Sequence, residues 1–174
     1  MSVIKRVSVC DLILSPESFS AGDKILLSGK VYTARDAAHK KLIELLNKGE
    51  KPPIELQNAA IYYAGPTEAR PPMPSGSMGP TTSSRMDPFA PTLMEYGVKV
   101  MIGKGERSEE VRQAIIKHKG LYLLAVGGAG AIAAKCVESL KIVAFSELGT
   151  ESIKEITLKD FPLFVGIDSF GNKI

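Results

Sequence analysis

A stretch at 79–87, GPTTSSRMD, joins four consecutive hydroxyl residues to an arginine. The hydroxyls of Thr81 and Thr82 can donate hydrogen bonds to an anion, and the planar fork of Arg85 matches a carboxylate or a phosphate bidentately. These residue types in this order predict an anion-binding turn. The alternative interpretation is a polar linker of the same composition.

Two further cations, Arg35 and Lys104, stand where a strand or turn gives way to a helix, as Arg85 does. Helix N-termini favour anions, and loops on a rigid frame carry binding groups. If the fold brings the three cations to one edge, the site suits a small dianion, although each cation alone is more often a solvated surface charge. His39 follows Arg35 by four residues and therefore shares one helix flank with it. It is either a general acid or base or a hydrogen-bonded structural histidine.

The elements that position these residues follow from hydrophobic spacing and from turn residues. Strands are predicted at 3–9, 24–32, 59–64, 98–102, 121–126, 142–145, 153–158 and 163–167. Helices are predicted after Thr33 as N-cap, over 88–96 with Asp87 as N-cap, over 109–118 with Ser108 as N-cap, and from 127 through 136. Strands that alternate with helices predict one mixed α/β domain over residues 1–174.

Composition excludes several classes of protein. The chain has 174 residues with a net charge of +3, spread along the sequence, which does not favour nucleic acid or a membrane surface as a partner. Two distant cysteines predict neither a disulfide framework nor a metal site on this chain. Without a transmembrane stretch or signal segment, we expect a soluble cytoplasmic domain.

Several stretches, in order, resemble the β subunit or C-terminal domain of class I fumarases and L-tartrate dehydratases. They are SGKVYTARDAAHK at 28–40, the run at 79–87, MIGKG at 101–105, AVGGA at 125–129, and the closing segments 160–162 and 168–172. The resemblance extends from about residue 12 to the end. Ser84 stands where that family often has glycine, a small substitution.

The resemblance implies a swivelling β/β/α domain with mixed sheets and flanking helices, in an enzyme that adds or removes water across a carbon–carbon double bond. It further implies a [4Fe–4S] cluster held by three cysteines of a separate α subunit, and two cysteines are too few to hold it here. This chain would then contribute half of an active site within a higher oligomer of αβ units. It would be active only with its α subunit.

The resemblance also implies roles for individual residues. The carboxylates of a four-carbon dicarboxylate would be held by Arg35, Arg85, Lys104 and Thr82. Thr81 would transfer the proton at carbon. Supporting roles would fall to Asp36, His39, Ser28 and Gly29. The sequence does not decide between fumarate hydratase and L-tartrate dehydratase. The alternative from another class of protein is a non-catalytic domain for small-anion binding or assembly.

Overall fold

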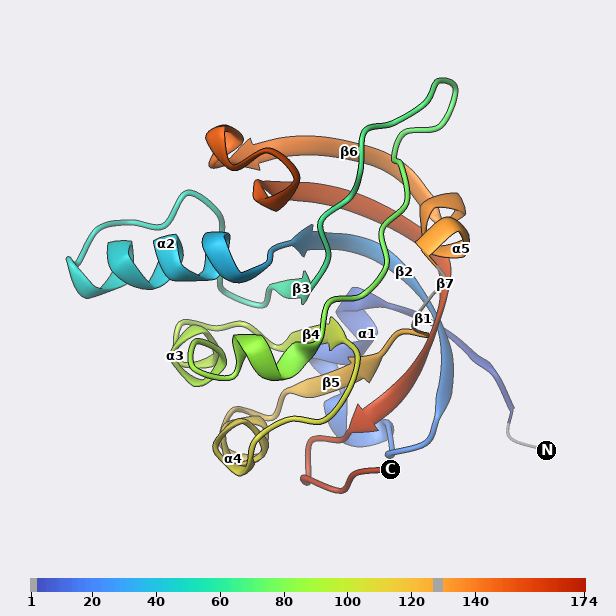
Figure 1. Cartoon of the computed structure of the whole chain (residues 1–174). Coiled ribbons are helices and arrows are strands. Elements are labelled where there is room, and N and C mark those ends of the chain that lie inside the picture. The colour runs from blue at the N-terminus through green and yellow to red at the C-terminus, as the bar shows by residue number, and fades with distance from the viewer. Residues whose placement is uncertain (1–2, 127–129) are drawn as a thin grey trace.

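The computed structural model describes residues 3–126 and 130–174, and its centre is a seven-stranded mixed sheet (Figure 1). The strands are β1 Lys5–Ser8, β2 Lys24–Thr33, β3 Ala60–Tyr62, β4 Val100–Gly103, β5 Leu121–Leu124, β6 Val137–Ala144 and β7 Ile153–Ile167. Their order is β1-β2-β3-β4-β5-β7-β6, and β2 also pairs with β7. Because of that second pairing, β2, β3, β4, β5 and β7 form a closed, barrel-like ring, with β1 and β6 outside it.

Strand direction decides where the connecting loops meet. β2, β3, β4 and β5 run parallel, while β7 is antiparallel to its three partners β2, β5 and β6. In the ring, Tyr32 pairs with Ile61, and Ile61 pairs with Met101. The segments that leave the carboxyl ends of β2, β3 and β4 therefore emerge side by side, which is the usual place for a binding site on parallel strands.

The helices are α1 Val9–Leu14, α2 Asp36–Asn47, α3 Ala90–Glu95, α4 Glu109–His118 and α5 Gly130–Lys135, with short 3-10 turns at Pro16–Ser18, Ser83–Met86 and Ser146–Glu151. Helices α2, α3 and α4 lie on one side of the ring (Figure 1). In β3 and β4, Tyr62 and Ile102 belong to one apolar cluster, whereas Ile61 and Met101 belong to the cluster under those helices. Both faces of these strands are buried, which explains their continuous apolar sequence.

Several sequence predictions are confirmed. The class is mixed α/β, and α4 runs over Glu109–His118 with the Ser108 hydroxyl accepting from the Val111 N–H at 3.3 Å. A glycine inside the strand predicted at 24–32 indicates a bulge or a close backbone approach, and Gly29 marks a register shift in the β2–β7 pairing, with φ +126°. A Cβ there would come within 3.1 Å of the Val9 side chain, so glycine permits the close approach of α1. The swivelling motion remains a prediction.

Other predictions are wrong, because tertiary contacts override local signals. Thr33 ends β2 and caps nothing, and α2 begins at Asp36 with Arg35 as N-cap. Asp87 does not cap α3, which begins at Ala90, because its carboxylate is occupied elsewhere.

Strand ends also differ from the predictions. Val9 begins a helix, β6 starts at Val137, and the two strands predicted over 153–158 and 163–167 form the single strand β7. The predicted glycine-rich helix start at 127–129 lies outside the described residues, and α5 is described from Gly130.

Candidate functional site

The hydroxyl run lies across the carboxyl ends of two neighbouring strands. The Thr81 N–H donates to the carbonyl oxygen of Tyr63, the residue after β3, at 2.7 Å. Thr82 forms an isolated parallel bridge with Lys104, the residue after β4, and the Ser83 N–H donates to the Lys104 carbonyl at 2.9 Å. Backbone pairing therefore places Thr81 and Thr82 beside Lys104.

Ser83 is the buried point of this run. Its hydroxyl hydrogen bonds with the Tyr122 hydroxyl at 2.9 Å, and the Tyr122 hydroxyl donates to the Gly105 carbonyl at 2.8 Å. A Cβ on Gly103 would lie 1.9 Å from the Ser83 Oγ. Glycine at the end of β4 is thus required for the run to approach the strand this closely.

Arg85 reaches the start of α2. Its Nε donates to Asp36 Oδ1 at 3.0 Å, and its Nη2 lies 2.9 Å from Asp36 Oδ2 in an ion pair. Asp36 follows Arg35, the N-cap of α2, two residues beyond the end of β2. The structure therefore brings Arg35, Arg85 and Lys104 to one edge of the ring.

The Arg35 side chain lies in a narrow gap. A Cβ added to Gly65 would come within 3.0 Å of Arg35 Cδ and within 3.0 Å of the Thr150 carbonyl oxygen. Arg35 Nε is buried and has no hydrogen-bond partner among the described residues. A buried N–H without an acceptor is destabilising, and a bound anion would satisfy it.

The buried side chain of His39 contacts the backbone at the start of α2. It is fully buried, its Nδ1 hydrogen bonds with the Arg35 carbonyl at 2.8 Å, and its ring packs edge-on against Tyr63. Because the carbonyl accepts, Nδ1 carries the proton. Burial lowers the pKa of His39 to about 4, so the imidazole is neutral at physiological pH. This geometry favours the structural interpretation of His39 over a general acid or base.

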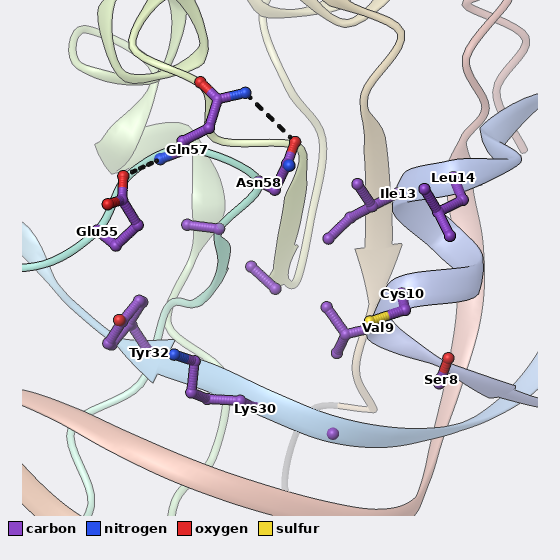
Figure 2. Close-up of a pocket in the computed structure, with 13 residues that line it drawn as sticks. Ser8, Val9, Cys10, Ile13, Leu14, Lys30, Tyr32, Glu55, Gln57 and Asn58 are labelled. Carbon is purple, nitrogen blue, oxygen red and sulfur yellow. Dashed lines mark hydrogen bonds between the residues drawn. The ribbon is translucent and has the colours of Figure 1, made fainter.

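Ser28 and Gly29 are not brought to this edge. They precede Arg35 by six or seven residues along an extended strand, roughly 20 Å. The Ser28 hydroxyl accepts from the Asp160 N–H at 3.0 Å, and Gly29 lines a separate pocket of about 360 Å³ (Figure 2). The side chains of Val9, Cys10 and Ile13 from α1 line the same pocket, whose lining includes none of the three cations. In this structure, Ser28 and Gly29 serve the packing of β2.

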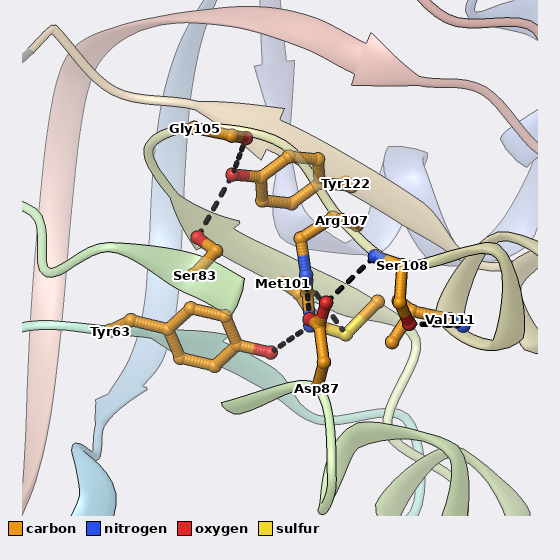
Figure 3. A network of polar contacts seen from close by, with 9 residues as sticks. All are labelled: Tyr63, Ser83, Asp87, Met101, Gly105, Arg107, Ser108, Val111 and Tyr122. Carbon is orange, nitrogen blue, oxygen red and sulfur yellow. Dashed lines mark hydrogen bonds and ion pairs between the residues drawn. The ribbon is translucent and has the colours of Figure 1, made fainter. Parts of the chain in front are cut away.

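Sequence reasoning missed a buried arginine behind the site. The Arg107 side chain has no exposed surface, and its guanidinium lies between the rings of Tyr63 and Tyr122, at 5.2 and 4.9 Å (Figure 3). Its Nε lies 2.6 Å from Asp87 Oδ1, and its Nη2 donates to the Tyr63 hydroxyl at 3.3 Å. No signal in the sequence GERS around Arg107 separates it from a surface charge.

These surroundings shift the pKa values of Arg107, Tyr63 and Tyr122. Burial opposes the charge of Arg107, but the Tyr63 and Asp87 side chains outweigh burial and raise the pKa of the guanidinium. Burial also raises the pKa of Tyr63, and it raises the pKa of Tyr122 to about 12. The two phenols therefore stay protonated, and Arg107 stays a cation.

Comparison with known proteins identifies the family. The family model described as fumarase C-terminus matches residues 6–174. The chain belongs to the fumarase C-terminus family. This fumarase C-terminus chain is 38% identical over 164 residues to fumarate hydratase class I, anaerobic, of Escherichia coli K12, covering 93% of the chain and 30% of that relative.

Two further relatives differ in how much of them is matched. Fumarate hydratase 2 of Leishmania major is 39% identical over 156 residues, which cover 88% of this chain and 28% of the relative. The putative L(+)-tartrate dehydratase subunit beta of Methanocaldococcus jannaschii is 37% identical over 164 residues, which cover 91% of this chain and 84% of the relative. The fumarase C-terminus chain thus spans under a third of these two fumarate hydratases and most of the beta subunit.

The thiols of this fumarase C-terminus chain do not meet. Cys10 is exposed on α1, and Cys136 is half-buried between α5 and β6. Within 3–126 and 130–174, no group of three or more His, Cys, Asp or Glu side chains could hold a metal ion. These residues therefore do not fit a cluster that needs three cysteine ligands. Among the described helices, none is long and apolar enough to cross a membrane.

Proposed function

We propose that this chain is the β subunit of a two-subunit hydro-lyase of the fumarate hydratase type, which interconverts fumarate and L-malate. The observation that carries the proposal is the gathering of Arg35, Arg85 and Lys104 beside Thr81 at the carboxyl edge of β2, β3 and β4. Membership of the fumarase C-terminus family supports a four-carbon dicarboxylate as the substrate class of this cationic edge.

The cations would bind the two substrate carboxylates. Asp36 contacts the Nε and Nη2 edge of Arg85, which leaves the edge made by Nη1 and Nη2 for a carboxylate. The buried Nε of Arg35 supplies a second donor, while Lys104 and the exposed hydroxyl of Thr82 complete the set. Removing a proton next to a carboxylate develops negative charge on that group, which cations already in place stabilise as it forms.

Thr81 would transfer the proton at carbon. Its N–H is fixed by the Tyr63 carbonyl, and its side chain is half-buried beside the exposed Thr82. A threonine hydroxyl is a weak base, so it needs neighbouring cations and a closed site that excludes water. Closure of a swivelling domain over the partner chain would supply that exclusion.

The cluster that the resemblance implies belongs, in this proposal, to a separate α subunit, because the cysteines of this chain do not fit it. The proposed complex is a cytoplasmic oligomer of αβ units. No step assigned to Thr81 or to the three cations depends on a metal held by this chain.

The second candidate activity is L-tartrate dehydration. A subunit named for that activity is matched over 84% of its length, whereas the two fumarate hydratases are matched over under a third. Both activities need two carboxylates bound and one proton moved. The arrangement of Arg35, Arg85 and Lys104 therefore supports either substrate.

The test is an assay of the purified chain, alone and with a class I α subunit carrying a reconstituted cluster. Fumarate, L-malate and L-tartrate are offered in parallel. We expect no turnover from the chain alone and turnover of one substrate pair from the complex. Activity of the chain alone would refute the two-subunit proposal. An inactive complex that still binds dicarboxylates would favour the non-catalytic anion-binding domain.

A further inference from the structure

The turn that carries the candidate residues stands on two buried anchors. At the first, Ser83 is held by the Tyr122 hydroxyl at 2.9 Å and by the Lys104 carbonyl at 2.9 Å. At the second, the Asp87 carboxylate accepts from Arg107 Nε at 2.6 Å and from the Ser108 N–H at 2.7 Å. The exposed residues Ser84 and Arg85 lie between these anchors. The position of Arg85 therefore depends on both.

The Arg107 guanidinium contacts both Asp87, at the end of the turn, and Tyr63, which holds the start of the turn. Its Nε binds Asp87, and its Nη2 donates to the Tyr63 hydroxyl at 3.3 Å. The carbonyl oxygen of Tyr63 in turn accepts the N–H of Thr81 at 2.7 Å. Figure 3 shows Arg107 in contact with both Tyr63 and Asp87. One guanidinium thus connects the backbone that presents Thr81 with the backbone that presents Arg85.

Stability alone does not explain such a cation. The Arg107 side chain is wholly buried, and that of Asp87 is 10% exposed. Desolvation of two charges offsets most of their attraction, and replacing such a pair with neutral groups is often neutral or stabilising. A rigid fork with several donors is suited instead to fixing the relative positions of its acceptors.

We propose, on the basis of the proposed function, that Arg107 is a positioning residue of the candidate site. It fixes Thr81 through Tyr63 and Arg85 through Asp87, and it does not contact the substrate. Displacing a catalytic group by about 1 Å costs on the order of 100-fold in rate, so a change at Arg107 acts on catalysis from behind the turn.

The test separates position from stability. Arg107→Met alone leaves the Asp87 carboxylate buried without a cation and should lower the melting temperature. Arg107→Met combined with Asp87→Asn removes both charges and keeps an oxygen for the Ser108 N–H. We expect the double variant to recover most of the melting temperature. We also expect KM to rise about tenfold and kcat to fall about tenfold, or about 100-fold in kcat/KM.

KM is the informative quantity, because a loss of folded protein lowers the apparent kcat and leaves KM unchanged. Arg107→Lys keeps the charge but cannot reach Asp87 and Tyr63 together, so it should fold well and still show a raised KM. The matched control is Arg112→Met, which loses the contact between Arg112 Nε and the Gly171 carbonyl at 2.6 Å and does not touch the turn. Its kinetics should equal those of the parent.

Amide hydrogen exchange of the chain by itself provides a readout without activity. In the double variant, the amides of Thr81 and Ser83 should exchange faster, while that of Leu27 in β2 stays protected. Parental exchange rates at Thr81 and Ser83, or exchange rates raised evenly over the chain, would overturn the role of Arg107. A KM equal to that of the parent would overturn it as well. If the parental complex has no hydro-lyase activity, the proposed function fails, and the exchange experiment still decides the role of Arg107.

Discussion

Arg85 and Asp36 form an ion pair across 49 residues of sequence, with Arg85 Nε 3.0 Å from Asp36 Oδ1. The pair joins the hydroxyl run to the N-terminus of α2 and so brings Arg85 next to Arg35. Both partners remain accessible, with 52% of the Arg85 and 34% of the Asp36 side chain exposed. An exposed pair of this kind contributes little to stability, so we interpret its effect as one on geometry.

The first prediction concerns Asp36. Asp36→Asn removes the charge that orients the Arg85 fork, so KM for the dicarboxylate should rise several-fold, while the melting temperature changes little. Glu44→Gln is the matched control, because it makes the same charge change on an exposed part of α2. Equal KM values for the two variants in steady-state assays would contradict the orienting role.

Arg85→Lys tests the fork itself. A lysine keeps the charge but cannot contact Asp36 and a substrate carboxylate bidentately at once. Losing one charge-assisted hydrogen bond costs about 1.5–3 kcal/mol, roughly a ten- to hundredfold fall in kcat/KM. Arg6→Lys serves as control, because Arg6 pairs with Asp160 in a surface ion pair away from the site. An unchanged kcat/KM in Arg85→Lys would remove Arg85 from the substrate site.

Thr81 is tested by a pair of substitutions. Thr81→Val removes the hydroxyl at nearly constant shape, and kcat should fall by about two to four powers of ten if this hydroxyl moves the proton. Thr81→Ser should retain much more activity, and Thr92→Val on α3 controls for the same change elsewhere. A raised KM with parental kcat in Thr81→Val would instead make Thr81 a positioning contact.

The pH dependence of stability follows from His39. Its pKa is about 4 in the folded chain and about 6.5 when unfolded. Between these values the unfolded state binds more protons, so stability falls as pH decreases from about 6.5 to about 4 and the loss levels off below that. The group accounts for about 3 kcal/mol over this range.

Thermal unfolding at a series of pH values measures this loss. His39→Asn should flatten the slope between pH 4 and 6.5. His118→Asn should flatten it less, because this other histidine is only half-buried at the end of α4, and burial, which lowers its pKa as well, acts on it less than on the fully buried His39. Equal slopes in the two variants would show that other groups cause the acid sensitivity.

The sequence by itself determined what depends on short-range signals. The N-cap at Ser108 fixed α4, and the glycine within a β-rich segment located the bulge at Gly29. In both places a side chain or a backbone conformation acts on residues within one turn or one strand crossing, so the pattern is visible locally. The order of matching motifs likewise identified the family.

Only the tertiary structure decided which groups are shared between distant segments. Asp87 has the sequence context of a helix N-cap, yet Arg107 and the Ser108 N–H, 20 and 21 residues away, occupy its carboxylate. Pro162 lies between the two strands predicted at 153–158 and 163–167, yet β7 continues through it and through Asp160, which has a positive φ, because β2 pairs with β7 along 154–164.

Contacts between distant segments also decide which arginines lie at the candidate site. Arg35, Arg85 and Arg107 are alike in sequence, each a cation near a helix start. The fold places the first two at the edge of the ring and buries the third between two tyrosine rings. Burial depends on which strands are neighbours in the closed ring, and that order is set by long-range pairing such as β2 with β7. Local sequence does not encode such pairing, so the difference between an arginine at the edge of the ring and an arginine buried behind it is a property of the tertiary structure alone.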